Sequence, residues 1–398
     1  MLKRWRETKT QNDEPAPQAA QVELKENPSK SLIVNPAARD NRHLLRGPKL
    51  RFVEDAPFNL ELIKYLVPTG HLVAETYRVG SSAAKQVVLV YLDHVANLEI
   101  VKEVRQRVRA IRTPSLFDAS YIQRNIEDCG WSPFPQVEVT NRLDNVQSAL
   151  WQGRVAILLD GSPDVLVAPC TFFELMDTPD DAYSRWPFAT SFFKIARYIM
   201  LLFALCLPGF YIALFSYNPQ LVPTRLLLLS INAREWTPFP IYFEAFMMMG
   251  ITEAIRMMMI RMPTQLGSTI ALFSGIALIM AGLHSHLVGA LVVIVTTLTV
   301  ISSFAIPDYD LRSAIRIFQF FTMIMSSFFG LFGFASAFFI ICIHLVNLKS
   351  FAIPYLAPLA PLEPSGWGHT ILRQNTKEMP MDETFKPQGK RLDDENPR

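Results

Sequence analysis

The sequence predicts an α/β N-terminal half of about 190 residues, followed by an all-α polytopic membrane domain of about four to five helices. Apolar residues make up 50% of the 398-residue chain and charged residues only 19%, whereas about a quarter is usual. No Asp, Glu, Lys or Arg occurs between Arg261 and Asp308. Because a helix crosses the hydrocarbon core with about 20 residues, this stretch is long enough for a hairpin of two crossings. The N-terminal half is instead rich in charge, with a short β-branched run between amphipathic helices, which is typical of an α/β fold.

Residues 1–48 are rich in Lys, Glu, Asn, Pro and Gln and poor in aromatic residues. A segment of this composition buries too little apolar surface to fold, so we predict a disordered tether. The first residues are positively charged, but no apolar stretch follows them. This pattern argues against a cleaved signal peptide and predicts a cytoplasmic N-terminal domain.

A first α/β subdomain is predicted over residues 49–113. Residues 59–67 and 96–111 have apolar side chains at helical spacing, and residues 86–92 form a β-branched run suited to a buried strand. The second helix carries several basic residues. They could bind anionic lipid headgroups or an acidic partner, but we expect a solvated helix face.

A second α/β subdomain is predicted over residues 114–190. Its predicted elements are two helices and then two strands, at 121–128, 141–152, 154–160 and 165–168. A Gly-Ser-Pro turn separates the two strands. Asp160 precedes this turn, and we interpret it as a turn residue rather than a catalytic acid.

The membrane domain is predicted over residues 191–349. The apolar run 198–217 contains no Asp, Glu, Lys or Arg, and basic and aromatic residues precede it, which favours a cytoplasmic start. Prolines interrupt residues 219–240, so we expect that segment to lie in the interface. A last apolar run, 317–343, is long enough for one tilted crossing. An apolar elbow and a polar C-terminal tail follow over residues 350–398.

The helix predicted over residues 241–260 carries Glu244, Glu253 and Arg256. A bare charge at mid-bilayer costs about 2.5–3.5 kcal/mol, so these side chains should face protein or water. Glu253 and Arg256 are spaced to pair on one helix, and Glu244 lies about half a turn away from Glu253 around the helix. This arrangement suits a helix between a partner and an aqueous pathway, and a partly interfacial helix would explain it too.

Catalytic and ligand-binding motifs of the common classes are absent. The sequence has no GxSxG, P-loop, GxGxxG or HExxH, so we predict no catalytic residues, no cofactor and no enzyme activity. His284 and His286 have the wrong spacing for a helical metal pair, and we interpret the methionines of 247–262 as packing residues rather than a copper path. A net charge of +2 gives no reason to expect nucleic-acid binding.

Several long segments resemble the A subunit of the GerA family of bacterial spore germination receptors. They include TNRLDNVQSALWQGRVAILLDGSP, TFFELMDTPDDAYSRW, ISSFAIPDYDLRSAIRIFQF and LKSFAIPYLAPLAP, at 140–163, 171–186, 301–320 and 348–361. The resemblance implies an integral protein of the spore inner membrane with a cytoplasmic N-terminal domain. It also implies a homo-oligomeric ring around a pore, with a transporter-like B subunit and a C-subunit lipoprotein as partners beside membrane lipids.

The chain departs from the family pattern in the middle of the membrane domain. Met257, Met258 and Met259 stand where the family has an acid and two small residues, and residues 279–290 replace small and polar motifs. Small residues let membrane helices approach closely, so these departures bear on packing and conductance. Whether they abolish conduction is left open.

The leading hypothesis is therefore a germinant receptor A subunit that forms a ligand-gated ion channel and transduces nutrient binding into ion release. The candidate pore or gating residues are Glu244, Glu253 and Arg256, with Arg234 and Asp308 at the mouths of the pathway. Interhelical ion pairing is the alternative role for these charges. Two other hypotheses are a non-conducting scaffold or regulatory paralog that clusters germination proteins, and a secondary transporter. The nutrient, the ion, the ring size, the number of crossings and the side of the C-terminal tail are open.

Overall fold

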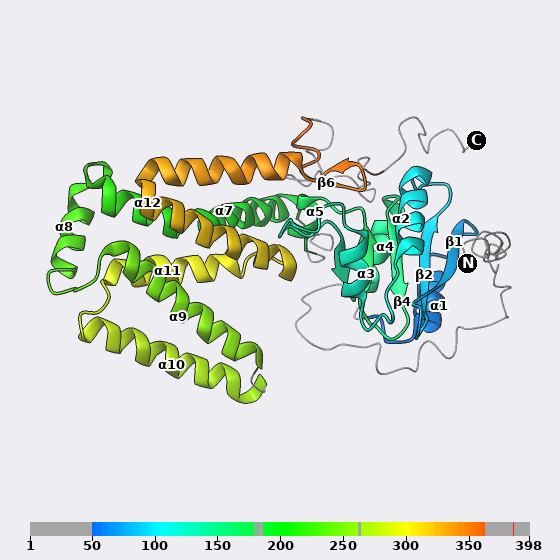
Figure 1. Cartoon of the computed structure of the whole chain (residues 1–398), viewed down its shortest axis with the longest axis horizontal. Coiled ribbons are helices and arrows are strands. Elements are labelled where there is room, and N and C mark those ends of the chain that lie inside the picture. The colour runs from blue at the N-terminus through cyan, green and yellow to red at the C-terminus, as the bar shows by residue number, and fades with distance from the viewer. Residues whose placement is uncertain (1–49, 179–180, 182–185, 262–263, 363–384, 386–398) are drawn as a thin grey trace, which may run out of the picture.

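The computed structural model describes residues 50–178, 181, 186–261, 264–362 and 385. An α/β domain lies at one end of the elongated molecule, and long helices extend away from it (Figure 1). The predicted fold class, an α/β domain followed by an all-helical region, is confirmed. The predicted tether, residues 1–48, lies outside the described residues.

The α/β domain is built on one antiparallel five-stranded sheet with the strand order β1-β2-β4-β5-β3. The strands are β1 (Leu72–Val79), β2 (Lys85–Leu92), β3 (Glu138–Thr140), β4 (Val155–Leu159) and β5 (Val165–Ala168). Strand β2 pairs with β4, so strands from both predicted subdomains join in a single sheet.

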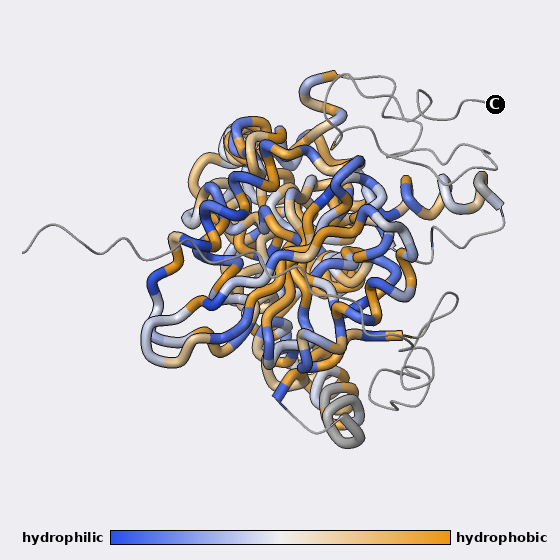
Figure 2. The backbone as a smooth tube through the Cα atoms, turned by 90° about the vertical axis from the view of Figure 1, so that its right-hand side faces the viewer, coloured by the Kyte–Doolittle hydropathy of each residue, from blue (hydrophilic) through white to orange (hydrophobic). Residues whose placement is uncertain are grey.

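Helices cover both faces of this sheet because the buried strands are apolar on both sides. Val87 and Leu89 pack with α2 (Leu98–Ala110) and α3 (Ala119–Ile126). Val88 and Val90 pack on the opposite face with α1 (Ala56–Leu66) and α4 (Leu143–Trp151). Alternate residues of a strand point to opposite faces, so one β-branched run fills both cores. Seen from this end, hydrophobic segments run through the centre of the molecule (Figure 2).

Side-chain caps explain where three of these helices begin. Asp55, Asn97 and Asp118 each accept a hydrogen bond from a backbone N–H in the first turn of α1, α2 and α3. Such a cap satisfies one of the N–H groups that a helix start leaves free. The predicted helices and strands of this domain begin within a few residues of the observed ones, whereas β1 and β3 were not predicted.

The helical region begins after the short helix α5 (Phe172–Met176). Helix α7 (Pro187–Ile212) leads away from the α/β domain, continues through Pro208, and ends in a π-helical turn, η2 (Ala213–Tyr217). The short elements η3 (Pro219–Leu221) and α8 (Thr224–Ala233) follow, and α8 lies at the far end of the molecule (Figure 1). Then come α9 (Ile241–Arg261), α10 (Thr264–His284), α11 (Ala290–Ser303) and α12 (Tyr309–Asn347).

Helix α12 is folded back on itself at Gly330. This residue has φ of 58° and ψ of −134°, which is not helical. The rings of Phe318 and His344 lie 6.1 Å apart, although an unbroken helix would separate these residues by about 39 Å. The predicted single crossing over residues 317–343 is therefore wrong, because the chain forms an antiparallel pair of helices there.

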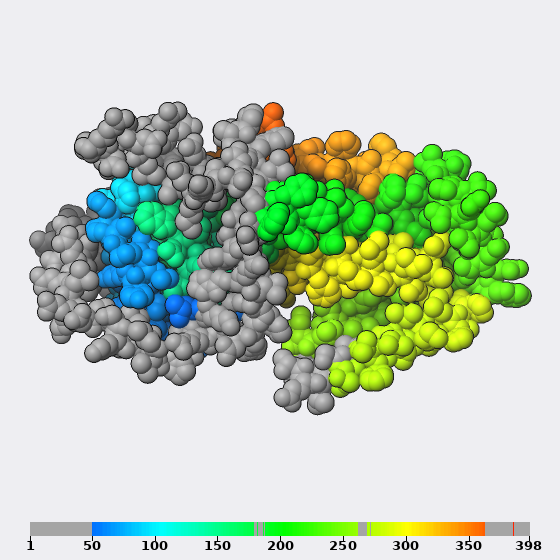
Figure 3. Space-filling view, turned by 180° about the vertical axis from the view of Figure 1, so that it is seen from behind, coloured from blue at the N-terminus to red at the C-terminus, as the bar shows by residue number. Residues whose placement is uncertain are grey.

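Small and polar residues hold α7 close to the first half of α12. A Cβ atom on Gly209 would lie 3.0 Å from Thr322 Oγ1 and 3.2 Å from Ser326 Oγ. The Thr322 hydroxyl donates a hydrogen bond to the Leu205 carbonyl across this contact. Glycine at the contact lets two helices approach closely. Helix α7 also lies beside α11, as Figure 3 shows.

After α12 the chain turns back against the α/β domain. The small hairpin β6 (Lys349–Ser350) and β7 (Ile353–Pro354) encloses Phe351 and Ala352, which have positive φ values of 48° and 68°. Phe172 N donates a hydrogen bond to the Tyr355 carbonyl over 2.9 Å. The predicted apolar elbow is thus a packed part of the fold. Of the C-terminal tail beyond it, only Phe385 is described.

Candidate functional site

Glu244 joins the ends of three helices at the far end of the helical region. It lies in the first turn of α9 and is fully buried. Its Oε1 lies 3.2 Å from Arg234 Nη2, directly after α8, and its Oε2 accepts a hydrogen bond of 3.5 Å from Gly289 N, directly before α11. Arg234 also donates to the Phe239 carbonyl. A buried pair of this kind holds its neighbours in place, and removing one partner is costly.

A second cluster lies further along α9. Glu253 Oε1 is 2.7 Å from Arg316 Nη1 of α12, and Glu253 Oε2 is 3.0 Å from Arg256 Nη1. Arg316 also donates to Ser313 Oγ. One carboxylate between two guanidinium groups leaves this cluster with a net charge of +1. The side chains are partly exposed, with 19% of Glu253 accessible.

The two clusters lie on different sides of α9, and Glu253 pairs with Arg256, as expected from their spacing. The carboxylates lie about 13 Å apart along the helix axis. Glu244 contacts α8 and α11, whereas Glu253 contacts α12. Both carboxylates are therefore in ion pairs, as the alternative interpretation of these charges expected.

Asp308 lies at the start of α12 and caps it. Its Oδ1 accepts a hydrogen bond of 2.7 Å from Leu311 N. Burial raises the pKa of this carboxyl to about 6. Among the described hydrogen bonds and ion pairs, Asp308 joins neither glutamate cluster. It thus has a clear structural role at a helix N-terminus.

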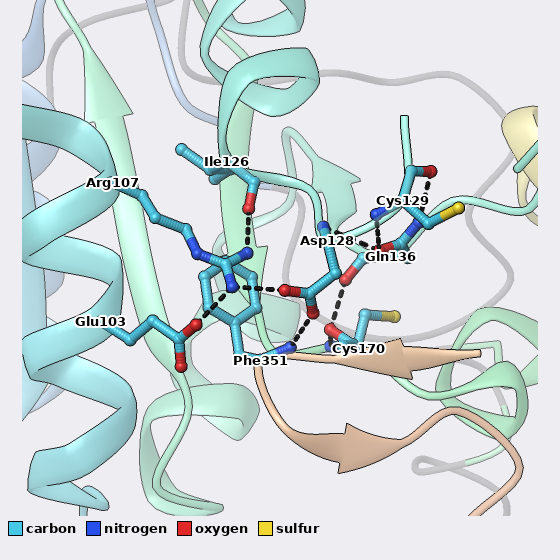
Figure 4. Close-up of polar contacts among 9 residues, drawn as sticks. Glu103, Arg107, Ile126, Asp128, Cys129, Gln136, Cys170 and Phe351 are labelled. Atoms are coloured by element: carbon cyan, nitrogen blue, oxygen red, sulfur yellow. Dashed lines mark hydrogen bonds and ion pairs between the residues drawn. The ribbon is translucent and has the colours of Figure 1, made fainter. Parts of the chain in front are cut away.

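Sequence reasoning missed a third polar cluster, which joins the elbow to the α/β domain. Asp128 Oδ2 accepts a hydrogen bond of 2.7 Å from Phe351 N, and its Oδ1 pairs with Arg107 (Figure 4). The Arg107 guanidinium lies 4.5 Å above the centre of the Phe351 ring and donates to the Ile126 carbonyl. Favourable cation–π contacts have this geometry. We call Arg107, Asp128, Gln136, Ser350 and Phe351 the elbow junction.

Gln136, which Figure 4 shows beside Asp128 and Cys129, and Ser350 complete the elbow junction. The fully buried Gln136 side chain accepts hydrogen bonds from Asp128 N and Cys129 N and donates to the Cys129 carbonyl. Ser350 Oγ donates to the Gln136 carbonyl over 2.6 Å and accepts from Cys170 N over 3.1 Å. These bonds satisfy groups that would otherwise be buried without partners.

The basic residues of α2 act mainly within the chain. Arg105 Nε donates to Glu75 Oε2 over 2.8 Å, Arg107 belongs to the elbow junction, and Arg109 lies 5.0 Å above the Tyr77 ring. The expected solvated face is therefore wrong for Arg105 and Arg107. Their partners Glu75 and Asp128 lie 30 and 21 residues away in the sequence, so the sequence of the helix alone does not show these pairings.

Arg154, directly before β4, is the centre of a further buried network. Only 2% of its side chain is accessible, and its guanidinium pairs with Glu138 of β3 at 2.6 Å and Glu174 of α5 at 3.1 Å. It also donates to the Pro169 carbonyl and lies over the ring of Phe385. Among the described residues, no group of three or more His, Cys, Asp or Glu side chains is arranged to hold a metal ion.

The sequence profile of a family described as "Bacillus/Clostridium GerA spore germination protein" matches residues 16–384. The chain belongs to the GerA family. The chain is 34% identical to the spore germination protein GerLA of Bacillus cereus, over 88% of this chain and 73% of that protein. It is also 34% identical to the spore germination protein A1 of Bacillus subtilis strain 168, over 85% and 70% of the two chains.

Two further similarities complete the comparison of this GerA-family chain. The uncharacterized membrane protein YfkQ of Bacillus subtilis strain 168 is 34% identical over 84% of this chain and 67% of its own. Among solved structures, the N-terminal domain of the A subunit of the Bacillus megaterium spore germinant receptor GerK3 is 35% identical. It covers 31% of this chain and 97% of its own, with a TM-score of 0.26.

The GerA-like motifs lie where separate parts of the chain meet. The segment 301–320 contains both Asp308 and Arg316, and the segment 348–361 forms the elbow. Met257, Met258 and Met259, where we expected a departure from the family pattern, are exposed on α9. Within one copy of the chain these methionines therefore contribute little to helix packing.

Proposed function

We propose that this chain is the A subunit of a nutrient germinant receptor in the endospore inner membrane. In this proposal the subunits form a ring around an ion channel, which opens when nutrient binds and starts germination. The match to GerA spore germination proteins over residues 16–384 carries the germination role. A transporter-like B subunit and a C-subunit lipoprotein would be its partners.

The surface of the helical region supports membrane insertion. By length and composition, two apolar helical segments of the described residues could enter a membrane: Phe188–Tyr217, and Tyr309–Asn347, which folds back on itself at Gly330. Large apolar side chains on α12, among them Phe328 (73% accessible) and Phe332 (77% accessible), face outward. Contiguous exposed apolar surface is rare on soluble proteins and is typical of lipid or subunit contact.

Glu253 is the best candidate for an ion pathway. It is partly exposed, and two arginines hold it between α9 and α12. Glu244 is fully buried between helix ends, which fits a clamp better than a pore lining. The five charges predicted for one pathway therefore divide into a structural pair, Arg234 and Glu244, a helix cap, Asp308, and a gating pair, Glu253 and Arg256. Arg316, which was not predicted, joins the gating pair through Glu253.

The test is ion flux through liposomes that contain the purified full-length chain. We expect Glu253→Gln to change ion conductance or selectivity, because it removes the only carboxylate described between the two arginines. The matched control is Glu235→Gln, at an exposed position outside both clusters. Unchanged conductance and selectivity in the Glu253→Gln protein would contradict the pore-lining role.

A second candidate function is a non-conducting scaffold that clusters other germination proteins. The exposed methionines at 257–259 favour it, because they give α9 an adaptable apolar surface in place of small residues. In this case the purified protein would form oligomers, and liposomes that contain it would pass no ions.

A further inference from the structure

Among the described strands, the sheet of the α/β domain has an unpaired edge at β1. This strand is the first in the order β1-β2-β4-β5-β3. Asp93 N donates to the His71 carbonyl just before β1, so His71 and Asp93 are a hydrogen-bonded pair. In an antiparallel pair of strands, hydrogen-bonded and non-hydrogen-bonded residues alternate. In the register with β2, residues 73, 75, 77 and 79 of β1 are therefore the hydrogen-bonded ones. The N–H and C=O groups of Ala74, Thr76 and Arg78 therefore point away from β2. An edge of this kind can accept one more strand.

A cavity of about 610 Å³ lies beside this edge. Residues 76–81 form one wall, and Arg109, Ile111 and Arg112, at the end of α2, form the other. The backbone groups of Thr76 and Arg78 thus face a groove between an edge strand and a helix. Many peptide-binding domains use this geometry to add an extended segment to their sheet.

The groove is positively charged. Its lining contains Arg78, Arg109 and Arg112 and no Asp or Glu. The nearby Glu75 carboxylate is already paired with Arg105. Arg109 lies over the Tyr77 ring, which orients its guanidinium at the groove wall.

We propose that this groove binds an extended acidic segment of a partner protein by strand addition to β1. Main-chain hydrogen bonds to Thr76 and Arg78 would hold the segment, and acidic side chains would reach Arg109 and Arg112. A second copy of the chain is the less suitable occupant, since it would present the same three arginines and repel the first. This interaction surface is separate from the proposed ion pathway.

The first experiment measures peptide binding by fluorescence anisotropy with the full-length chain in detergent. The probe is a labelled peptide of about ten residues in which Glu and Val alternate, and a Lys and Val peptide is its counterpart. We expect saturable binding of the Glu peptide and at least about tenfold weaker binding of the Lys peptide. Failure of the Glu peptide to saturate would overturn the proposal.

Two charge-reversal variants locate the binding surface. Arg78→Glu/Arg112→Glu changes two exposed residues of the groove, and Lys102→Glu/Arg124→Glu makes the same change in net charge at exposed positions outside it. We expect about tenfold weaker binding for the first variant and an unchanged affinity for the second. If the groove variant does not fold, Arg112→Gln gives the same test with a smaller change. Equal effects of the two reversals would overturn the proposal.

A third probe tests strand addition itself. Methylation of alternate backbone nitrogens of the Glu peptide keeps its charge but removes the N–H donors that would pair with β1. We expect the methylated peptide to lose saturable binding. Equal binding of both peptides would overturn strand addition, and an altered oligomer size in the groove variant would point to a second copy as the occupant.

Discussion

The backbone N–H of Phe351 donates a hydrogen bond to Asp128 Oδ2 over 2.7 Å, which ties the chain after its last helix to the end of α3. Arg107 pairs with the same carboxylate and covers the Phe351 ring. A displacement of the second half of α12 along its axis would therefore pull directly on the α/β domain. The elbow junction is a physical route by which the two parts can influence each other.

Asp128→Ala should loosen the elbow junction. It leaves Phe351 N without its acceptor and removes one of the carboxylates that pair with Arg107. We expect a loss of about 1–2 kcal/mol in the free energy of unfolding and faster hydrogen exchange in residues 349–357, measured by mass spectrometry. Asp93→Ala, at an exposed position, is the control and should leave that exchange unchanged. Equal exchange in both variants would contradict the role of Asp128.

Gly330→Ala should destabilise the turn within α12. The residue has φ of 58°, and a Cβ atom there would lie 2.9 Å from the Cβ of Tyr217. We expect a cost of about 1–3 kcal/mol, observed as a lower Tm of the full chain in detergent. Gly250→Ala is the control, because a Cβ there meets no atom within 4 Å. That change should be neutral or stabilising. A Tm for Gly330→Ala equal to that of wild type would refute the strained turn.

Glu253 and Arg316 should be energetically coupled. In a double-mutant cycle with Glu253→Gln and Arg316→Ala, we expect a coupling energy of about 0.5–3 kcal/mol in thermal or denaturant unfolding, because the two side chains are 2.7 Å apart. The control cycle combines Glu253→Gln with Arg312→Ala. Arg312 donates to the Ile306 carbonyl, so its coupling to Glu253 should be small. Similar coupling in both cycles would show that the pair is not specific.

Asp308 should make stability depend on pH. Its folded-state pKa of about 6 lies above the value of about 3.9 in an unfolded chain. The folded state therefore binds more protons between these values, and stability is lost as the pH rises towards 6. We expect the Tm of Asp308→Asn to rise relative to wild type between about pH 4 and pH 6, while asparagine still caps α12. A difference from wild type that stays constant across this range would exclude the titration of Asp308.

The sequence predicted the elements that carry a regular apolar pattern. The run QVVLVYL forms the buried strand β2, and the pairing of Glu253 with Arg256 followed from their spacing. Strand β1 was missed because Glu75 and Arg78 interrupt its apolar alternation. The structure accommodates Glu75 by pairing it with Arg105, a residue of another element. A local pattern carries no signal for such a partner.

Two other features were beyond local reasoning for a different reason. Gly330 lies in an apolar run that the sequence pattern predicts to be one helix, because membrane helices often contain glycine. Only the packing of the second half of α12 against its first half shows the turn. The pairing of Arg316 with Glu253 depends on how α9 and α12 pack. The gating candidates on α9 follow from the sequence, whereas their partner on α12 does not.

The reversal at Gly330 also decides which parts of the chain are accessible on each side of a bilayer. Because α12 returns to its starting end, the chain enters and leaves the helical region beside the α/β domain (Figure 1). In the proposed membrane location, the described residues at the opposite surface of the bilayer are η3, α8 and the turns near His286 and Gly330. A reporter fused after residue 362 would share a compartment with the α/β domain. An impermeant reagent added on the opposite side of the bilayer would reach few of the described residues.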